Sequence, residues 1–105
     1  MIRVIVSYPN DPTKKFDLDY YMAKHMPMVA AKLGPHGMKT WTVTKGLAGM
    51  APGSPAAFMI QASLDFATME GVQAGMALEA PGIMADIPNY TDIAPQIQID
   101  EVLGS

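Results

Sequence analysis

One histidine of this sequence lies where its side chain could carry out chemistry. It is His25, within FDLDYYMAKHMPMVAAKLG, residues 16–34. At about 100° per residue, a helix here would turn one stripe toward the core; that stripe holds Leu18, Met22, His25, Val29 and Leu33. Histidine, with an unperturbed pKa of about 6.5, suits proton transfer near neutral pH. We expect His25 to act as a general acid or base on a pocket floor; the alternative is a neutral core histidine hydrogen-bonded within the fold.

Two carboxylates in a later segment are candidates to orient the His25 ring. Asp86 and Asp92 lie in ADIPNYTDIAP, a loop-like stretch that leads back toward the last predicted strand. A carboxylate there could reach the first helix, and a His–Asp pair would orient the ring and raise its basicity. Asp92 is our catalytic candidate beside His25. The alternative is that these aspartates make local turn hydrogen bonds.

Aromatic and methionine side chains are candidates to bind a ligand. Tyr8, Tyr21, Trp41 and Tyr90 could line an aromatic pocket whose hydroxyl or indole N–H groups orient a planar molecule. The ten methionines could supply pliable pocket walls, and Met22 is the one that we choose as a ligand-binding candidate. Each of these residues could equally fill the core or a dimer interface.

Composition excludes several classes of function. The net charge is −3 and the seven basic residues are scattered, so we expect no nucleic-acid partner. There is no cysteine, and the two histidines, His25 and His36, have no metal-ligand spacing, so we expect no metal and no cofactor. No signal-like segment opens the chain and no apolar run could span a bilayer, so the expected location is the cytoplasm, without a membrane partner.

Hydrophobic periodicity predicts the order βαββαβ in one domain, residues 1–105. Alternating apolar residues predict strands over 2–8, 38–47, 58–64 and 95–103. Helical spacing predicts a first helix between the Asp17 cap and Gly34, kinked at Pro27 just after His25. A second helix is predicted from 69 to 80, ended by Pro81 and Gly82.

This order predicts an α+β, ferredoxin-like fold, with an antiparallel four-stranded sheet and both helices on one face. The other face would carry either Trp41 or the threonine row of 40–44, together with Met59. A partly apolar face of this kind needs a cover. We therefore expect a symmetric homodimer that forms through the sheet face.

Two sequence blocks resemble the EthD family, named for ethyl tert-butyl ether degradation. The first, F-D-x-x-Y-Y-x-x-x-H-x-P, is formed by Phe16, Asp17, Tyr20, Tyr21, His25 and Pro27. The second, A-D-x-x-N-[FY]-T-D, is formed by Ala85, Asp86, Asn89, Tyr90, Thr91 and Asp92. The resemblance covers almost the whole chain.

The resemblance implies a dimeric α+β barrel in which each protomer keeps a pocket between its sheet and its helices. Some members accompany a cytochrome P450 system for ether breakdown, and fungal relatives dehydrate or decarboxylate aromatic polyketides. Similar barrels include cofactor-free monooxygenases, muconolactone isomerases and haem enzymes, so the family indicates the fold better than the reaction.

Three hypotheses about function follow from these residues. The leading one is cofactor-independent acid–base or oxidative chemistry on a small apolar or aromatic compound, by a lyase, isomerase or oxidoreductase. The second is a non-catalytic module that binds such a compound or supports an oxygenase system. In the third, His25 and the loop carboxylates serve only the fold.

Overall fold

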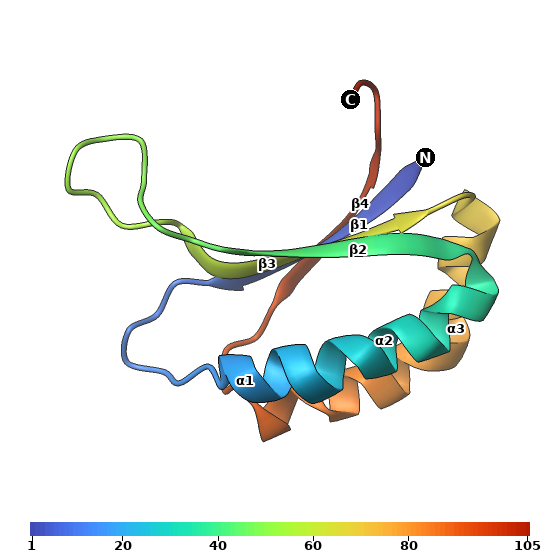
Figure 1. Cartoon of the computed structure of the whole chain (residues 1–105), viewed down its shortest axis with the longest axis horizontal. Helices are drawn as coiled ribbons and strands as arrows, with labels where there is room; N and C mark the ends of the chain where they lie inside the picture. Colours follow the sequence, from blue (N-terminus) through green and yellow to red (C-terminus); the bar gives the residue numbers. More distant parts are fainter.

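The computed structural model describes residues 1–105 and contains four strands and two helical regions (Figure 1). The strands are β1 (Ile2–Pro9), β2 (Met38–Lys45), β3 (Phe58–Phe66) and β4 (Gln96–Glu101). The first helical region comprises α1 (Leu18–Tyr20), a π-helical turn (Tyr21–His25), α2 (Met26–Leu33) and a 3-10 turn (Gly34–His36). The second comprises α3 (Met69–Ala85) and a 3-10 turn (Ile87–Asn89). The predicted βαββαβ order is confirmed.

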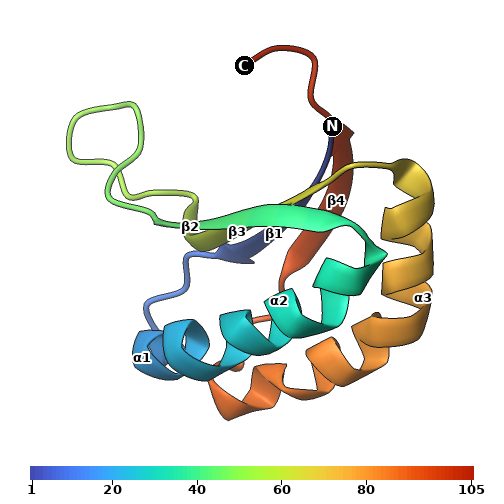
Figure 2. The same cartoon turned by 45° about the vertical axis from the view of Figure 1, so that its right-hand side comes forward.

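The strands form one antiparallel sheet in the order β2-β3-β1-β4. Both helical regions lie on the same side of this sheet, as Figure 2 shows. The side chains of the central strands β1 and β3 alternate between the two faces of the sheet. On β3 the helix-facing side chains are buried, and they are Ile60, Ala62, Leu64 and Phe66. This alternation sends one set of side chains toward the helices and the other away from them. The predicted α+β, ferredoxin-like fold is therefore confirmed.

The face of the sheet turned away from the helices is mostly polar. Ile5 pairs with Ser63 on one side and with Gln98 on the other, so these three side chains share this face. Trp41 pairs with Leu64, which is buried against the helices, so Trp41 points to the helix side and the threonines of β2 point away. The threonine row, one of the two alternatives expected for this face, is therefore the one found, whereas Met59 packs against the core. Ile5 and Phe58 are apolar residues at this face, beside the polar Ser7, Gln61, Gln96 and Gln98.

The first helical region is irregular just before Pro27, where the sequence predicted a kink. Asp17 caps the region as predicted, because its side chain accepts a hydrogen bond from the Tyr20 N–H. Pro27 has no N–H to donate, so the regular ladder must change near it. The Met26 N–H reaches back five residues to the Tyr21 carbonyl, which makes a π-helical turn before the proline. The break in the regular ladder expected near His25 takes the form of this turn, which ends at His25 and leads directly into α2.

Helix α3 is longer than the sequence predicted. Thr68 caps its first turn by accepting from the Gly71 N–H, and the helix then runs through Pro81 and Gly82 to Ala85. Both Pro81 and Gly82 are exposed, so the carbonyl that Pro81 leaves without a partner lies on the solvent side. On the inner side Ile83 packs against the core. Tertiary packing therefore holds the last turn against the local preference for a helix end.

Two glycines of α3 provide a matched test of the packing between α3 and the first helical region. A Cβ atom at Gly71 would collide with the His36 carbonyl, whereas a Cβ at Gly82 would meet only the flexible end of Lys32. We expect Gly71→Ala to lower the free energy of unfolding by about 1–3 kcal/mol. Gly82→Ala should be neutral or stabilising by up to about 1 kcal/mol. Urea unfolding of both variants measures the difference, and equal effects would contradict the close approach.

Candidate functional site

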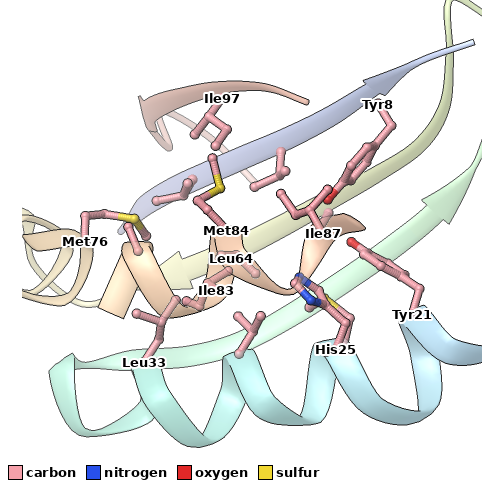
Figure 3. A pocket seen from close by; sticks show the side chains of 16 residues that line it. Tyr8, Tyr21, His25, Leu33, Leu64, Met76, Ile83, Met84, Ile87 and Ile97 are labelled. Atoms are coloured by element: carbon pink, nitrogen blue, oxygen red, sulfur yellow. The ribbon is translucent and has the colours of Figure 1, made fainter. Parts of the chain in front are cut away.

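An apolar pocket lies between the helices and the strands β1, β3 and β4 (Figure 3). Of its 16 lining residues, 15 are hydrophobic. The mouth lies between α3 and β4, where Met84 and Ile97 are 43% and 46% exposed. A pocket with such walls suits a small and largely apolar ligand. Its lining residues are Val4, Val6, Tyr8, Tyr21, His25, Met26, Val29, Leu33, Ala62, Leu64, Met76, Ala80, Ile83, Met84, Ile87 and Ile97.

Backbone and side-chain contacts bring the two distant sequence blocks together at one end of this pocket. Phe16 and Thr91 form an isolated β-bridge, and the Asp17 N–H donates to the Tyr90 carbonyl at 2.8 Å. The Thr91 hydroxyl donates to the Lys15 carbonyl at 2.7 Å. The segment after α3 is thereby fixed against the start of the first helical region, so that side chains of both can meet.

His25 occupies the wall of the pocket with both ring nitrogens in contact with polar groups. Its side chain is 5% exposed, and its Nδ1 lies 2.9 Å from Oδ2 of Asp86. Because an ionised carboxylate only accepts hydrogen bonds, Nδ1 carries the proton of this bond. In the neutral ring Nε2 is then an acceptor, and the Tyr90 hydroxyl lies 3.3 Å from it. The pair holds the ring in one orientation and one tautomer.

The Asp86 carboxylate is held by two further donors. The Tyr20 hydroxyl donates to Oδ1 at 2.7 Å and the Asn89 side-chain amide donates to the same atom at 2.9 Å. Burial by itself raises the pKa of Asp86, but the hydrogen bonds from Asn89, His25 and Tyr20 together bring that pKa below its ordinary value. Asp86 is therefore ionised at neutral pH, as a partner of His25 must be.

A second hydroxyl extends the chain of hydrogen bonds. The Tyr8 and Tyr90 hydroxyls lie 2.6 Å apart, and since Tyr90 donates to Nε2 of His25, Tyr8 is the donor to Tyr90. Burial raises the pKa of Tyr8 and of Tyr90, so both hydroxyls keep their protons at neutral pH. A continuous path from Tyr8 through Tyr90 and His25 to Asp86 is the result.

Three residues chosen from the sequence lie outside this arrangement. Asp92 is exposed and makes no side-chain hydrogen bond, so the carboxylate that pairs with His25 is Asp86. Trp41 lies on β2, the edge strand farthest from the pocket mouth, and does not line the pocket. Met22 is 40% exposed and does not line it either.

The π-helical turn explains the position of Met22. An α-helical turn would place Met22 on the same stripe as Met26, but the turn here has one more residue, so Tyr21 takes that place. The pocket is lined by Tyr8, Tyr21 and His25, as expected. Tyr90 does not line it but contacts Nε2 of His25 through its hydroxyl.

Two residues that hold the site were not chosen as site residues from the sequence. Tyr20 and Asn89 both donate to Asp86, and their only signal was membership of the two blocks that resemble EthD proteins. The structure has no group of three or more His, Asp or Glu side chains able to hold a metal ion. None of its helices combines the length and apolar character that crossing a membrane requires.

Replacing Asp86 should change how stability depends on pH. Because the folded pKa of Asp86 is below its unfolded value, its pairing stabilises the fold above the ordinary aspartate pKa of about 3.9 and is lost as the pH falls through the folded pKa. We expect Asp86→Asn to cost about 1–3 kcal/mol at neutral pH, and the gap to wild type to close below about pH 4. Denaturant unfolding across pH measures this, with exposed Asp92→Asn as the control. A gap that does not change with pH would contradict the pairing.

Comparison with known proteins places this geometry in a family. No protein-family model matches the chain, and no curated protein matches it. Among solved structures, a dimeric ferredoxin-like protein from an uncultured marine organism has 7% identity over 99% of this chain and 95% of its own, with a TM-score of 0.62. An ethyl tert-butyl ether (EthD) family protein from Bacillus halodurans C-125 has 19% identity over 98% of this chain and 99% of its own, with a TM-score of 0.68. These two show the fold alone.

A third solved structure is much more similar. An EthD-like protein from Ralstonia eutropha JMP134 has 45% identity over 98% of this chain and 92% of its own, with a TM-score of 0.91. Such identity over nearly the full length of both chains agrees with the two sequence blocks that meet at His25 and Asp86. The chain therefore belongs to the EthD family.

Proposed function

We propose that the protein binds a small apolar or aromatic compound in the helix–sheet pocket and moves a proton to or from it, with His25 as the acid–base group. The observation that carries this proposal is the buried His25–Asp86 pair on the wall of an otherwise apolar pocket. A histidine in the core could be satisfied by one backbone carbonyl. Here the ring instead has an ionised partner at one nitrogen and a hydroxyl at the other.

The arrangement suits both directions of proton transfer. Asp86 stabilises the imidazolium that forms when Nε2 accepts a proton, so His25 can act as a base and return the proton as an acid. The contact from Tyr90 to Nε2 is 3.3 Å, which is long for such a bond, so a ligand can replace it. The Tyr8–Tyr90 pair is available to shuttle the proton. Dehydration or isomerisation of an activated carbonyl compound needs only these steps, and it is the cofactor-independent chemistry that we propose.

One observation favours a second candidate function, binding of such a compound without catalysis. The hydroxyls of Tyr8 and Tyr90 and both nitrogens of His25 contact one another or Asp86, so these polar groups are already satisfied without a ligand. In that case the network would serve to shape the pocket.

Carbon-bound proton exchange distinguishes the two functions without knowledge of the natural substrate. Small ketones, phenols and hydroxy-aromatic carbonyl compounds are incubated with the protein in D2O, and loss of proton NMR signal gives the exchange rate. We expect wild type to accelerate exchange of at least one compound, and His25→Gln to lose about 10²- to 10⁴-fold of that rate.

The control for this experiment is His36→Gln, which replaces the other histidine of the chain, on the 3-10 turn after α2, and should exchange as wild type does. If wild type and His25→Gln exchange every compound equally, the catalytic proposal is wrong. A thermal shift with the same compounds would then favour the binding function.

We also propose that two copies form a homodimer through the uncovered sheet face, which would make the dimeric α+β barrel. Support comes from the sheet itself, which has no helix on that side, and from the fold shared with solved proteins described as dimeric. Because this face is mostly polar, the interface would rest on hydrogen bonds around Ile5, Ser63 and Gln98 rather than on a large apolar area.

Sedimentation equilibrium tests the homodimer. Wild type should have twice the mass of the chain, and Ser63→Arg, at the centre of the uncovered face, should shift it toward the monomer. Gln73→Arg, on the exposed side of α3, should remain dimeric. A monomeric wild type, or dissociation by both variants alike, would contradict an interface at the sheet face.

A further inference from the structure

One hydroxyl of the pocket has no partner in the protein. Of the four tyrosines, Tyr8, Tyr20 and Tyr90 each form a side-chain hydrogen bond, whereas the Tyr21 hydroxyl forms none. Tyr21 is nevertheless 1% exposed and lines the pocket. In Figure 3 its hydroxyl points from the helix toward the space beside Tyr8 and Ile87.

This hydroxyl opens on to the pocket rather than being sealed in the core. Every fully buried side-chain nitrogen or oxygen in this structure forms a hydrogen bond. The Tyr21 oxygen forms none, so it is not fully buried and must border free space. With the residue almost wholly buried, that space is the pocket. Leaving a hydroxyl unpaired in such surroundings costs about 1–3 kcal/mol, which phenylalanine would avoid.

The surroundings indicate what could pair with this hydroxyl. A water molecule needs two or more polar partners to be held, and the walls beside Tyr21 are apolar apart from groups already paired with each other. A ligand that carries one acceptor oxygen on an apolar body would satisfy the hydroxyl and fill the pocket at once.

The charge of that ligand follows from the lining. No lysine or arginine lines the pocket, and the one lining side chain that can become cationic, His25, is matched by the Asp86 carboxylate. An anionic ligand would therefore lose its hydration without gaining a counter-charge. Burial and the neighbouring Tyr8 raise the pKa of Tyr21, so its hydroxyl remains a donor at physiological pH. A neutral acceptor fits these conditions.

The position of Tyr21 relative to His25 narrows the class further. The two rings are stacked, with centroids 5.3 Å apart and planes 16° apart, and both come from the same π-helical turn. A donor next to the acid–base group suits a ligand whose acceptor is the oxygen of a carbonyl group bonded to the carbon that exchanges its proton. When that C–H bond breaks, the proton passes to His25 and the electron pair moves to the oxygen, where the Tyr21 O–H stabilises it.

We propose that the Tyr21 hydroxyl is the specificity-determining donor of the pocket and binds the neutral carbonyl oxygen of an otherwise apolar ligand. This inference rests on the proposed function because it uses the same pocket. It concerns recognition, however, and can hold or fail independently of whether His25 moves a proton.

Three probes of nearly the same shape test this inference. Acetophenone carries a neutral carbonyl, α-methylstyrene replaces that carbonyl by an apolar C=CH2 group, and benzoate carries a charge. Chemical-shift titration of the ¹⁵N-labelled protein gives the Kd of each probe for wild type and for Tyr21→Phe, which keeps the ring. Wild type should prefer acetophenone to both other probes. Tyr21→Phe should lose about tenfold in affinity for acetophenone and none for α-methylstyrene.

Two controls separate recognition from packing. Trp41→Phe, at an aromatic residue of β2 that does not line the pocket, should leave the preference for acetophenone over α-methylstyrene unchanged. Unliganded Tyr21→Phe should melt no lower than wild type, because the hydroxyl it loses has no partner. A markedly lower melting temperature would show a structural role for the hydroxyl and overturn the inference.

Further outcomes separate this inference from the proposed function. If wild type shows no preference for acetophenone over α-methylstyrene, including binding of neither, the inference is overturned. It is also overturned if Tyr21→Phe binds acetophenone as wild type does. If the preference depends on Tyr21 while His25→Gln leaves proton exchange unchanged, the inference stands and the catalytic proposal fails.

Discussion

The hydrogen bond from His25 Nδ1 to the Asp86 carboxylate joins two segments that are 61 residues apart in the sequence. Neither group could be buried alone at acceptable cost, because an unpaired carboxylate near the core must keep its hydration or take up a proton. The contacts around the pair follow from this constraint. Tyr20 and Asn89 share the charge of Asp86, and the bridge between Phe16 and Thr91 holds the two segments at the required distance.

The π-helical turn places two aromatic side chains, Tyr21 and His25, on one wall of the pocket. A regular helix would have turned Met22 inward, whereas the extra residue in the turn brings Tyr21 above His25. Such turns occur frequently at functional sites, and here the turn separates the end of α1 from Pro27. The same irregularity thus accommodates the missing N–H of proline and places a hydroxyl in the pocket.

Much of the fold could be predicted from the sequence, because the burial of alternate residues in β1 and β3 leaves a clear pattern. The inward position of His25 was predictable from its helical spacing with Val29 and Leu33. The place of Met22 was not, since a period of 3.6 residues carries no signal for one added residue. Local sequence patterns could not show whether Asp86 or Asp92 pairs with His25, because that depends on how the chain turns after α3. The end of α3 was mispredicted at Pro81 because packing of Ile83 outweighs local preference.

The most direct test of this account is the tautomer of the His25 ring. Ring ¹⁵N spectra of the labelled protein, recorded at mildly alkaline pH where an ordinary histidine is neutral, distinguish the protonated nitrogen from the unprotonated one. His36→Gln leaves a single histidine and so assigns the signals. We expect His25 to carry its proton on Nδ1 and none on Nε2, and Asp86→Asn to lose this preference. A proton on Nε2 in the wild type would contradict the His25–Asp86 pair on which the proposed chemistry depends.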